Sequence, residues 1–322
     1  MTHPFSQAGR PRLGVTLIEL IIAITLFALI GGMLVSVLLR QQRFQRALAD
    51  VADSRGRMRD IATIIPTDLR GTSSVGGDLL SIDLTSIQFR AAMGSSAVCS
   101  YASPAVIELP PKVLSSGNTI TSWINPPQPG DVVFIYNDGT AAGNADDTWS
   151  QFTITDTTSA VNAAWCSVGS GLTQAADAGQ RKYRVTVSPN PDPSRIRIGA
   201  PMRFAREVRY SLYAASDANW YVGYETCTPS GVVGVAGACA NREVLAGPVR
   251  AASTDTLTSG LYFLYYRQDG TRITSTAQAS QVAHLGIGLR TTPLSLRDAM
   301  KLGGTMVGRD SLRLTVGIRN RI

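Results

Sequence analysis

The chain has 322 residues, of which 44% are hydrophobic and 16% are charged, and its formal net charge is +7. This is the composition of a globular protein, and it excludes a largely disordered chain. The positive charge is modest and spread along the sequence, so it does not indicate a nucleic-acid-binding protein.

A long apolar helix is the first element that the sequence predicts. Arg10 and Arg12 precede Gly14, and residues 15–39 then carry a single charge, that of Glu19. As a helix with a rise of ~1.5 Å per residue, this run reaches about 37 Å, which is enough to cross a bilayer core of about 30 Å. A carboxylate inside such a run costs free energy and is usually functional.

This stretch resembles the prepilin-type start of type IV pilins and type II secretion pseudopilins. The matching residues are Gly14-Val15-Thr16-Leu17-Ile18-Glu19-Leu20. The resemblance implies that a prepilin peptidase cleaves between Gly14 and Val15 and methylates the new amine of Val15. It also implies roles in assembly for Thr16 and for Glu19, which would bind the Val15 amine of a neighbouring subunit. Because Glu19 lies four residues after Val15, it could also reach the amine of its own chain.

Residues 40–65 continue the helix as an amphipathic segment. Apolar side chains recur there at three- and four-residue steps, opposite a face of Arg, Gln and Asp. We expect Pro66 to end the helix, because the residue before a proline is pushed out of the helical conformation. Gly31 and Gly32 are weak points in the apolar half; they indicate either close packing against other helices or local melting in a fibre. The apolar stripe consists of Phe44, Leu48, Val51, Met58, Ile61 and Ile65.

From residue 66 onwards the sequence predicts a β-rich domain. Gly, Ser, Thr and Pro become frequent and separate short runs that are rich in Val, Ile, Tyr and Phe. In 181–187 and 311–319 apolar and polar residues alternate, which indicates half-buried strands of an antiparallel sheet. No stretch has the composition of a linker, so the sequence does not divide 66–322 further. The predicted strands are 86–91, 105–109, 131–136, 149–155, 181–187, 202–213, 220–225, 260–267, 282–290 and 311–319.

Four cysteines lie in this domain, and they indicate disulfides rather than a metal site. No pair has Cys-x-x-Cys spacing, and His284 is the only histidine after Gly14, so we expect no zinc site of the usual kind. A domain outside the inner membrane permits disulfides. Cys227 with Cys239 would close a glycine-rich loop and is the preferred pairing, which leaves Cys99 with Cys166.

The second half of the chain also resembles the soluble domains of PilW-like minor pilins and of J-type pseudopilins. The resemblance lies in the order of segments 206–212, 242–249 and 261–266, followed by an Asp269-Gly270 turn and an alternating strand. Length favours the PilW-like group, because a J-type pseudopilin is usually shorter.

Few residues offer chemistry. His284 lies in a predicted strand with no acid nearby in the sequence, and we expect it to be structural rather than catalytic. Asn137, Asp138, Asp146 and Asp147 bring together oxygen ligands of the kind that calcium takes, at a spacing unlike that of an EF-hand. The Asn-Asp-Gly sequence there is also an ordinary turn signal.

Two groups of side chains could form surfaces for partners. The aromatic group is Trp220, Tyr221 and Tyr224. The basic group is Arg309, Arg313, Arg319 and Arg321. We expect the aromatic group to be sheet core and edge, and the basic group to be the exposed face of an edge strand rather than a phosphate-binding patch.

Together these features predict an α+β protein of pilin-like architecture, with a long N-terminal helix packed on a mainly antiparallel β-sheet domain. The expected divisions are a leader (1–14), the helix (15–65) and an extracytoplasmic β-rich domain (66–322). Within the helix, 15–39 would be the transmembrane segment and filament core, and 40–65 the amphipathic part.

The resemblance implies a minor pilin-like structural subunit of a type IV pilus, not an enzyme, which helps to initiate or cap filament assembly. Its implied partners are the prepilin peptidase, the major pilin and other minor pilins or pseudopilins. Its implied location is the inner membrane, single-pass, with the C-terminal domain in the periplasm or outside, and then the pilus. Two alternatives stay open: a J-type minor pseudopilin of a type II secretion system, and a membrane-anchored enzyme or binding domain. We expect no cofactor beyond the weak calcium candidate and no specific nucleic acid.

Overall fold

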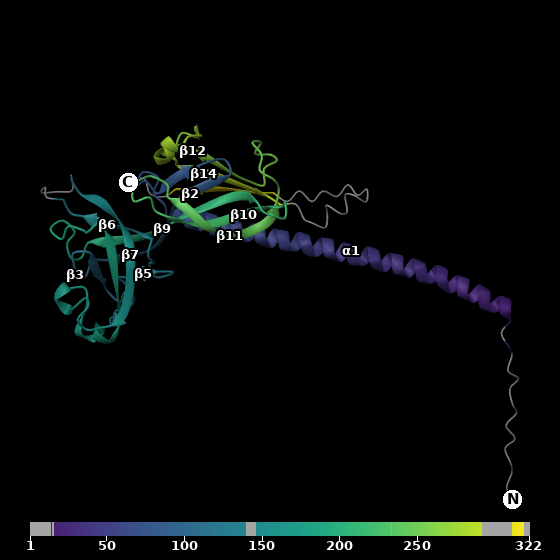
Figure 1. Ribbon diagram of the computed structural model, residues 1–322, viewed down its shortest axis with the longest axis horizontal. Helices are drawn as coiled ribbons and strands as arrows, with labels where there is room; N and C mark the ends of the chain where they lie inside the picture. The colour runs from purple at the N-terminus through teal and green to yellow at the C-terminus, as the bar shows by residue number, and fades with distance from the viewer. Residues whose placement is uncertain (1–13, 15, 140–145, 233, 292–310, 319–322) are drawn as a thin grey trace, which may run out of the picture. The chain divides into compact units, whose positions relative to one another are not determined.

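The computed structural model describes residues 14, 16–139, 146–232, 234–291 and 311–318 (Figure 1), apart from the side chains of residues 47, 50, 51 and 54. The chain divides into two compact units, one with the residues up to Ala52 and one that begins at Asp53. A single long helix contributes to both, and the described residues of the second unit otherwise form strands and three short 3-10 helices, η1 (Val168–Ser170), η2 (Ala175–Gly179) and η3 (Thr276–Gln281).

The helix α1 runs over Leu17–Arg70. Its stretch Leu17–Arg46 is long and apolar enough to cross a membrane, and 0% of its most apolar window is buried. Phe44 and Leu48 are also exposed, at 65% and 53%. The predicted apolar stripe is therefore buried only from Met58 onwards, and the side chain of Val51 lies outside the described residues.

The prediction that Pro66 ends the helix is wrong, since α1 continues through it to Arg70. A proline inside a helix costs about 3 kcal/mol. The last turn offsets this cost, because Ile65 and Leu69 are 0% exposed and Pro66 itself is buried. Full burial of one such aliphatic side chain contributes about 1.5–3 kcal/mol, so tertiary packing outweighs the local preference.

The described strands pair antiparallel and form two sheets. The first has eleven strands in the order β1-β2-β9-β6-β7-β8-β4-β3, with β10 between β9 and β11 and with β5 on β2. These strands are β1 (Leu79–Ile82), β2 (Ser86–Ala97), β3 (Ser100–Ser103), β4 (Val106–Leu109), β5 (Ser122–Trp123), β6 (Val132–Asn137), β7 (Thr148–Val161), β8 (Arg181–Ser188), β9 (Pro201–Ala214), β10 (Trp220–Thr228) and β11 (Ala238–Val249). The second sheet has the order β13-β12-β14-β15. Its strands are β12 (Leu261–Tyr266), β13 (Arg272–Ile273), β14 (His284–Arg290) and β15 (Ser311–Gly317).

The prediction of an α+β fold with a mainly antiparallel sheet is confirmed. All ten predicted strands are present, with most boundaries moved by a few residues and with β2 and β7 extended by six residues each at the C-terminal end. The strands β1, β3, β5, β11 and β13 are absent from the predicted set.

Two hydrophobic cores lie along the first sheet. One gathers the buried face of α1, the β2–β9–β10 region and the second sheet. The other gathers side chains of β4, β6, β7, β8 and the first half of β9. Strand β9 belongs to both: Met202 and Phe204 lie in the second core, and Val208 and Tyr210 in the first. Figure 1 shows β3, β5, β6 and β7 in one group of strands and β10, β11, β12 and β14 in another.

Both expected disulfides are present. Cys99 pairs with Cys166 and ties the end of β2 to the connection between β7 and β8. Cys227 pairs with Cys239, which faces it across the β10–β11 ladder. Each pair closes a loop within the β-rich unit, with sequence separations of 67 and 12 residues.

Candidate functional site

The start of α1 is a reciprocal hydrogen-bonded cap. Thr16 precedes the first helical residue, Leu17. Its backbone N–H and its hydroxyl both donate to Glu19 Oε2, at 3.1 Å each, and the Glu19 N–H donates to Thr16 Oγ1 at 3.4 Å. This is the capping box, in which a Thr before the helix and a Glu three residues later satisfy each other's backbone N–H groups.

The capping box occupies only one oxygen of the carboxylate. The hydrogen bonds from Thr16 end on Oε2 of Glu19, and within the described residues no bond is made to Oε1. A carboxylate at the first turn of a helix is also stabilised by the helix dipole. Glu19 can therefore cap its own helix and still accept a bond from an ammonium group.

The position of Glu19 along the helix explains how a carboxylate is tolerated in an apolar run. Arg40, the next charge, lies 21 positions after Glu19, which is ~32 Å of helix and close to the thickness of a bilayer core. When one charge lies at each boundary, neither lies at the costly midplane.

Gly14 is not needed by the fold. A Cβ built on it meets nothing within 4 Å in the described structure, and its φ is not in the left-handed region. Within the described residues, neither space nor backbone conformation requires a glycine here. Val15, the predicted site of methylation, lies outside the described residues.

The structure brings Thr16 and Glu19 together, but our reading of the sequence missed the capping box between them. The signal was present, since Thr16-Leu17-Ile18-Glu19 has the Thr-x-x-Glu pattern directly before an apolar run. The prepilin resemblance assigns the same two residues to assembly, whereas the structure shows that they also bond to each other within one chain.

A second feature that the sequence did not show fastens the end of the helix to the sheet. The hydroxyl of Tyr210 on β9 donates to Asp68 Oδ2 at 2.6 Å. Burial raises the pKa of the Asp68 carboxyl, against the opposing effect of this hydrogen bond. Burial and the neighbouring carboxylate likewise raise the pKa of Tyr210. The pair is thus a part-buried polar contact that joins the half-buried Asp68 to Tyr210 of the first core, 142 residues apart in sequence.

The calcium candidates are largely used by the protein itself. Asp147 accepts hydrogen bonds from the hydroxyl of Tyr136 and from Gly139 N, and Asp138 forms an ion pair with Arg197 at 3.6 Å. The amide of Asn137 donates to Ser150 Oγ at 3.1 Å. Within the described residues, which leave out 140–145, no three His, Cys, Asp or Glu side chains could hold a metal together. Calcium binding stays a prediction.

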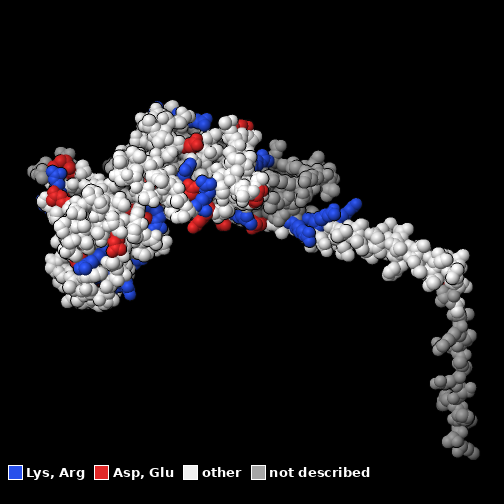
Figure 2. All heavy atoms as spheres, in the orientation of Figure 1, with Lys and Arg blue, Asp and Glu red and all other residues white. Residues whose placement is uncertain are grey.

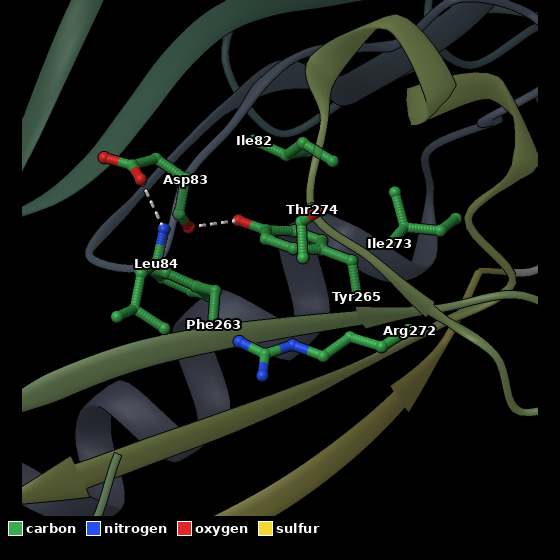
Figure 3. Close-up of a pocket in the computed structure, with 8 residues that line it drawn as sticks. All are labelled: Ile82, Asp83, Leu84, Phe263, Tyr265, Arg272, Ile273 and Thr274. Atoms are coloured by element: carbon green, nitrogen blue, oxygen red, sulfur yellow. Dashed lines mark hydrogen bonds between the residues drawn. The ribbon is translucent and has the colours of Figure 1, made fainter. Parts of the chain in front are cut away.

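A small pocket of about 120 Å³ lies where the β1–β2 turn meets the second sheet (Figure 3). Phe263 and Tyr265 line it, and the Tyr265 hydroxyl donates to the carbonyls of Asp83 and Ser86. Asp83 and Arg272 are the charged residues of its lining. The lining includes no histidine, cysteine or serine, so it offers no nucleophile–base pair of the usual kind.

The remaining candidates hold structural places. His284 on β14 stacks on Tyr266 of β12, with ring centroids 5.2 Å apart. Trp220 and Tyr224 pack against the first core. Of the basic group only Arg313 is described; it is exposed on the edge strand β15, and Arg309, Arg319 and Arg321 lie outside the described residues.

Comparison with known proteins supports the reading of the helix start. Residues 9–35 match the family model of the prokaryotic N-terminal methylation motif. No curated protein and no solved structure matches the chain. The motif suggests a structural rather than an enzymatic protein, anchored in a membrane by one helix. Residues 9–35 of the chain therefore contain the prokaryotic N-terminal methylation motif. With its long apolar helix and antiparallel β-sheet domain, the chain has the architecture of a type IV pilin-like protein with a prepilin-type start.

Proposed function

We propose that this chain is a minor pilin-like structural subunit of a type IV pilus, of the PilW-like group, which helps to initiate or cap filament assembly after processing by a prepilin peptidase. The observation that carries the proposal is the methylation motif at the start of an apolar stretch of helix, 0% of whose most apolar window is buried. An exposed helix of this length needs either lipid or other helices around it. The membrane supplies the lipid first, and the core of a filament then supplies the neighbouring helices.

Glu19 supplies the chemistry of the assembly step. In the membrane its carboxylate lies at the boundary of the bilayer core. In a dry bundle of helices an unpaired carboxylate would cost several kcal/mol. Oε1 of Glu19, which the capping box leaves free, can accept a hydrogen bond from the methylated amine of Val15 of a neighbouring subunit. This pairing would fix the axial register between subunits.

We infer that the β-rich unit lies on the periplasmic or outer side. Two disulfides support this orientation, because such bonds form and persist in oxidising compartments. The count of basic residues opposes it: Arg10 and Arg12 precede the span, whereas Arg40, Arg43 and Arg46 follow it directly. We give the disulfides more weight, since the unit contains no free cysteine in its described residues.

The experiment is N-terminal sequencing and intact mass measurement of the protein from membranes, with and without the peptidase. A mature chain that starts at methylated Val15 only when the peptidase is present would support the proposal. An unprocessed Met1 in both samples would overturn it. Replacing Gly14 with a bulky residue should block cleavage, so that only the full-length chain is found. The orientation is tested by fusing alkaline phosphatase after residue 318, which should be active if the β-rich unit lies on the periplasmic side.

A further inference from the structure

We propose that Arg40, Arg43 and Arg46, named here the arginine band, form a binding site for the headgroups of anionic phospholipids in the leaflet next to the β-rich unit. The inference rests on the membrane anchoring in the proposed function, but it assigns a ligand that the methylation motif does not imply. The band would fix the depth of the helix in the bilayer before the subunit leaves the membrane.

The arginine band begins where the apolar run ends. Leu39 is the last residue of the run, and all three arginines are exposed on α1. Gln41, Gln42 and Gln45 fill most of the positions between them. Figure 2 shows the helix white along most of its exposed length, with blue Lys and Arg atoms gathered on one stretch. The change from apolar to strongly polar surface is therefore abrupt.

The spacing of the band matches a headgroup layer. At 100° per residue, the three arginines at steps of three fan over about 120° of the helix, so one side presents all three guanidinium groups. Along the axis they span ~9 Å. A bilayer of about 40–45 Å with a core of about 30 Å has headgroup layers of about 5–8 Å. With Glu19 at one boundary of the core, Arg40 and Arg43 lie ~32 and ~36 Å along the axis, at the depth of the opposite headgroup layer, and Arg46 lies at its outer edge at ~40 Å.

The local sequence leaves two of these cations without an acidic neighbour. Residues 36–47 contain no Asp or Glu, so neither Arg40 nor Arg43 has a carboxylate within four positions along the helix. Arg46 differs, because Asp50 lies four residues later. Phosphate is the group that guanidinium matches with two parallel hydrogen bonds. A lipid phosphate at the depth of the band would supply such a group.

The size of the effect follows from the charge. One basic residue near an anionic membrane surface strengthens attraction about fivefold, so a pair should give about a 30-fold preference for anionic over neutral lipid at low salt. Higher salt should reduce this preference, because ions screen exposed charges.

The test uses full-length protein in nanodiscs that contain phosphatidylglycerol and phosphatidylcholine, released into native mass spectrometry. The variant is Arg40→Gln with Arg43→Gln. The matched control is Arg59→Gln with Arg70→Gln, which removes the same charge from exposed positions of the same helix beyond the span. We expect wild type and control to retain phosphatidylglycerol selectively, and the Arg40/Arg43 variant to lose most of that selectivity.

Equal lipid selectivity in all three proteins would overturn the inference. So would a variant that keeps its selectivity but is lost from pili, because the arginines would then serve carboxylates of other subunits. Membrane fractionation of the same samples keeps the two proposals apart: a wild-type chain that washes out of membranes would refute anchoring itself.

Discussion

The capping box allows the two roles of Glu19 to be separated by two small substitutions. Thr16→Ala removes the hydroxyl that bonds to Glu19 and leaves the carboxylate charged. Glu19→Gln keeps an oxygen that can accept from Thr16, since Gln also serves in a capping box, but it removes the negative charge. The first change damages the helix start, and the second damages any pairing with an ammonium group.

The expected magnitudes differ widely. Loss of a side-chain cap costs about 1 kcal/mol, within a range of about 0.5–2, which is about fivefold in an equilibrium. Loss of one partner of a buried ion pair costs about 3–5 kcal/mol, because the other charge is left unpaired. That corresponds to more than about 100-fold. We therefore expect Glu19→Gln to impair incorporation far more than Thr16→Ala.

The assay is the ratio of protein in sheared pili to processed protein in membranes, measured for each variant by quantitative immunoblot. Dividing by the processed form removes any effect of the substitutions on cleavage. Equal losses in the two variants, or a larger loss for Thr16→Ala, would show that Glu19 acts as a helix cap rather than as a charge. Normal incorporation of Glu19→Gln would refute the register role.

Three further predictions concern the β-rich unit. Because burial raises the pKa of Asp68 above its ordinary value of 3.8, the contribution of this carboxyl to stability is complete below pH 3.8 and is lost as pH rises through the folded pKa. Asp68→Asn, which keeps an acceptor for Tyr210, should therefore gain stability relative to wild type as pH rises from 3.8 through the folded pKa. Urea unfolding of the full chain in detergent at a series of pH values measures this difference. A free energy of unfolding that differs between variant and wild type by the same amount at every pH would contradict it. Gly94→Ala should destabilise the protein by about 1–3 kcal/mol, because its Cβ would lie 2.1 Å from the Ser122 carbonyl oxygen. Gly179→Ala, whose Cβ would meet no atom within 4 Å, is the control and should be nearly neutral. Thermal melting compares the two variants, and equal melting temperatures would show that β5 shifts to accommodate the new Cβ. Replacing Cys99 and Cys166 with serine should lower the free energy of unfolding by about 4 kcal/mol, and replacing Cys227 and Cys239 should lower it by about 3 kcal/mol, because the first pair closes the longer loop. If the Cys227/Cys239 variant instead had the lower denaturant midpoint, loop length would not determine the stabilisation.

The sequence identified those elements that local pattern determines. The ten predicted strands are runs of β-branched and aromatic residues between turn residues, and each forms. The strands β1, β3, β5 and β13 have two to four residues, too few for a period of two to show. Strand β11 is mostly exposed over its first seven residues and ends in Gly247-Pro248-Val249. Its sequence therefore has neither the apolar alternation nor the composition that predicts a strand.

Long-range packing explains the remaining errors. Pro66 stays helical because the sheet buries the turn around it, and no local rule contains that contact. The two cores went undetected because β9 runs through both without a change of composition. At the candidate site, Gly14, Thr16 and Glu19 lie within six positions and could be found from the motif. The contact between Asp68 and Tyr210 joins residues 142 positions apart.

The shared strand β9 also bears on how the β-rich unit comes apart. β9 pairs with β2 along one edge, and with β6 and then β10 along the other. Neither core can release its half of β9 without pulling on a ladder that the other core holds. Amide hydrogens along β9 should therefore exchange with solvent through one common opening event rather than two. A chain nicked in the connection between β7 and β8 should stay a single particle, because β9 on one fragment would still pair with β2 and β6 on the other.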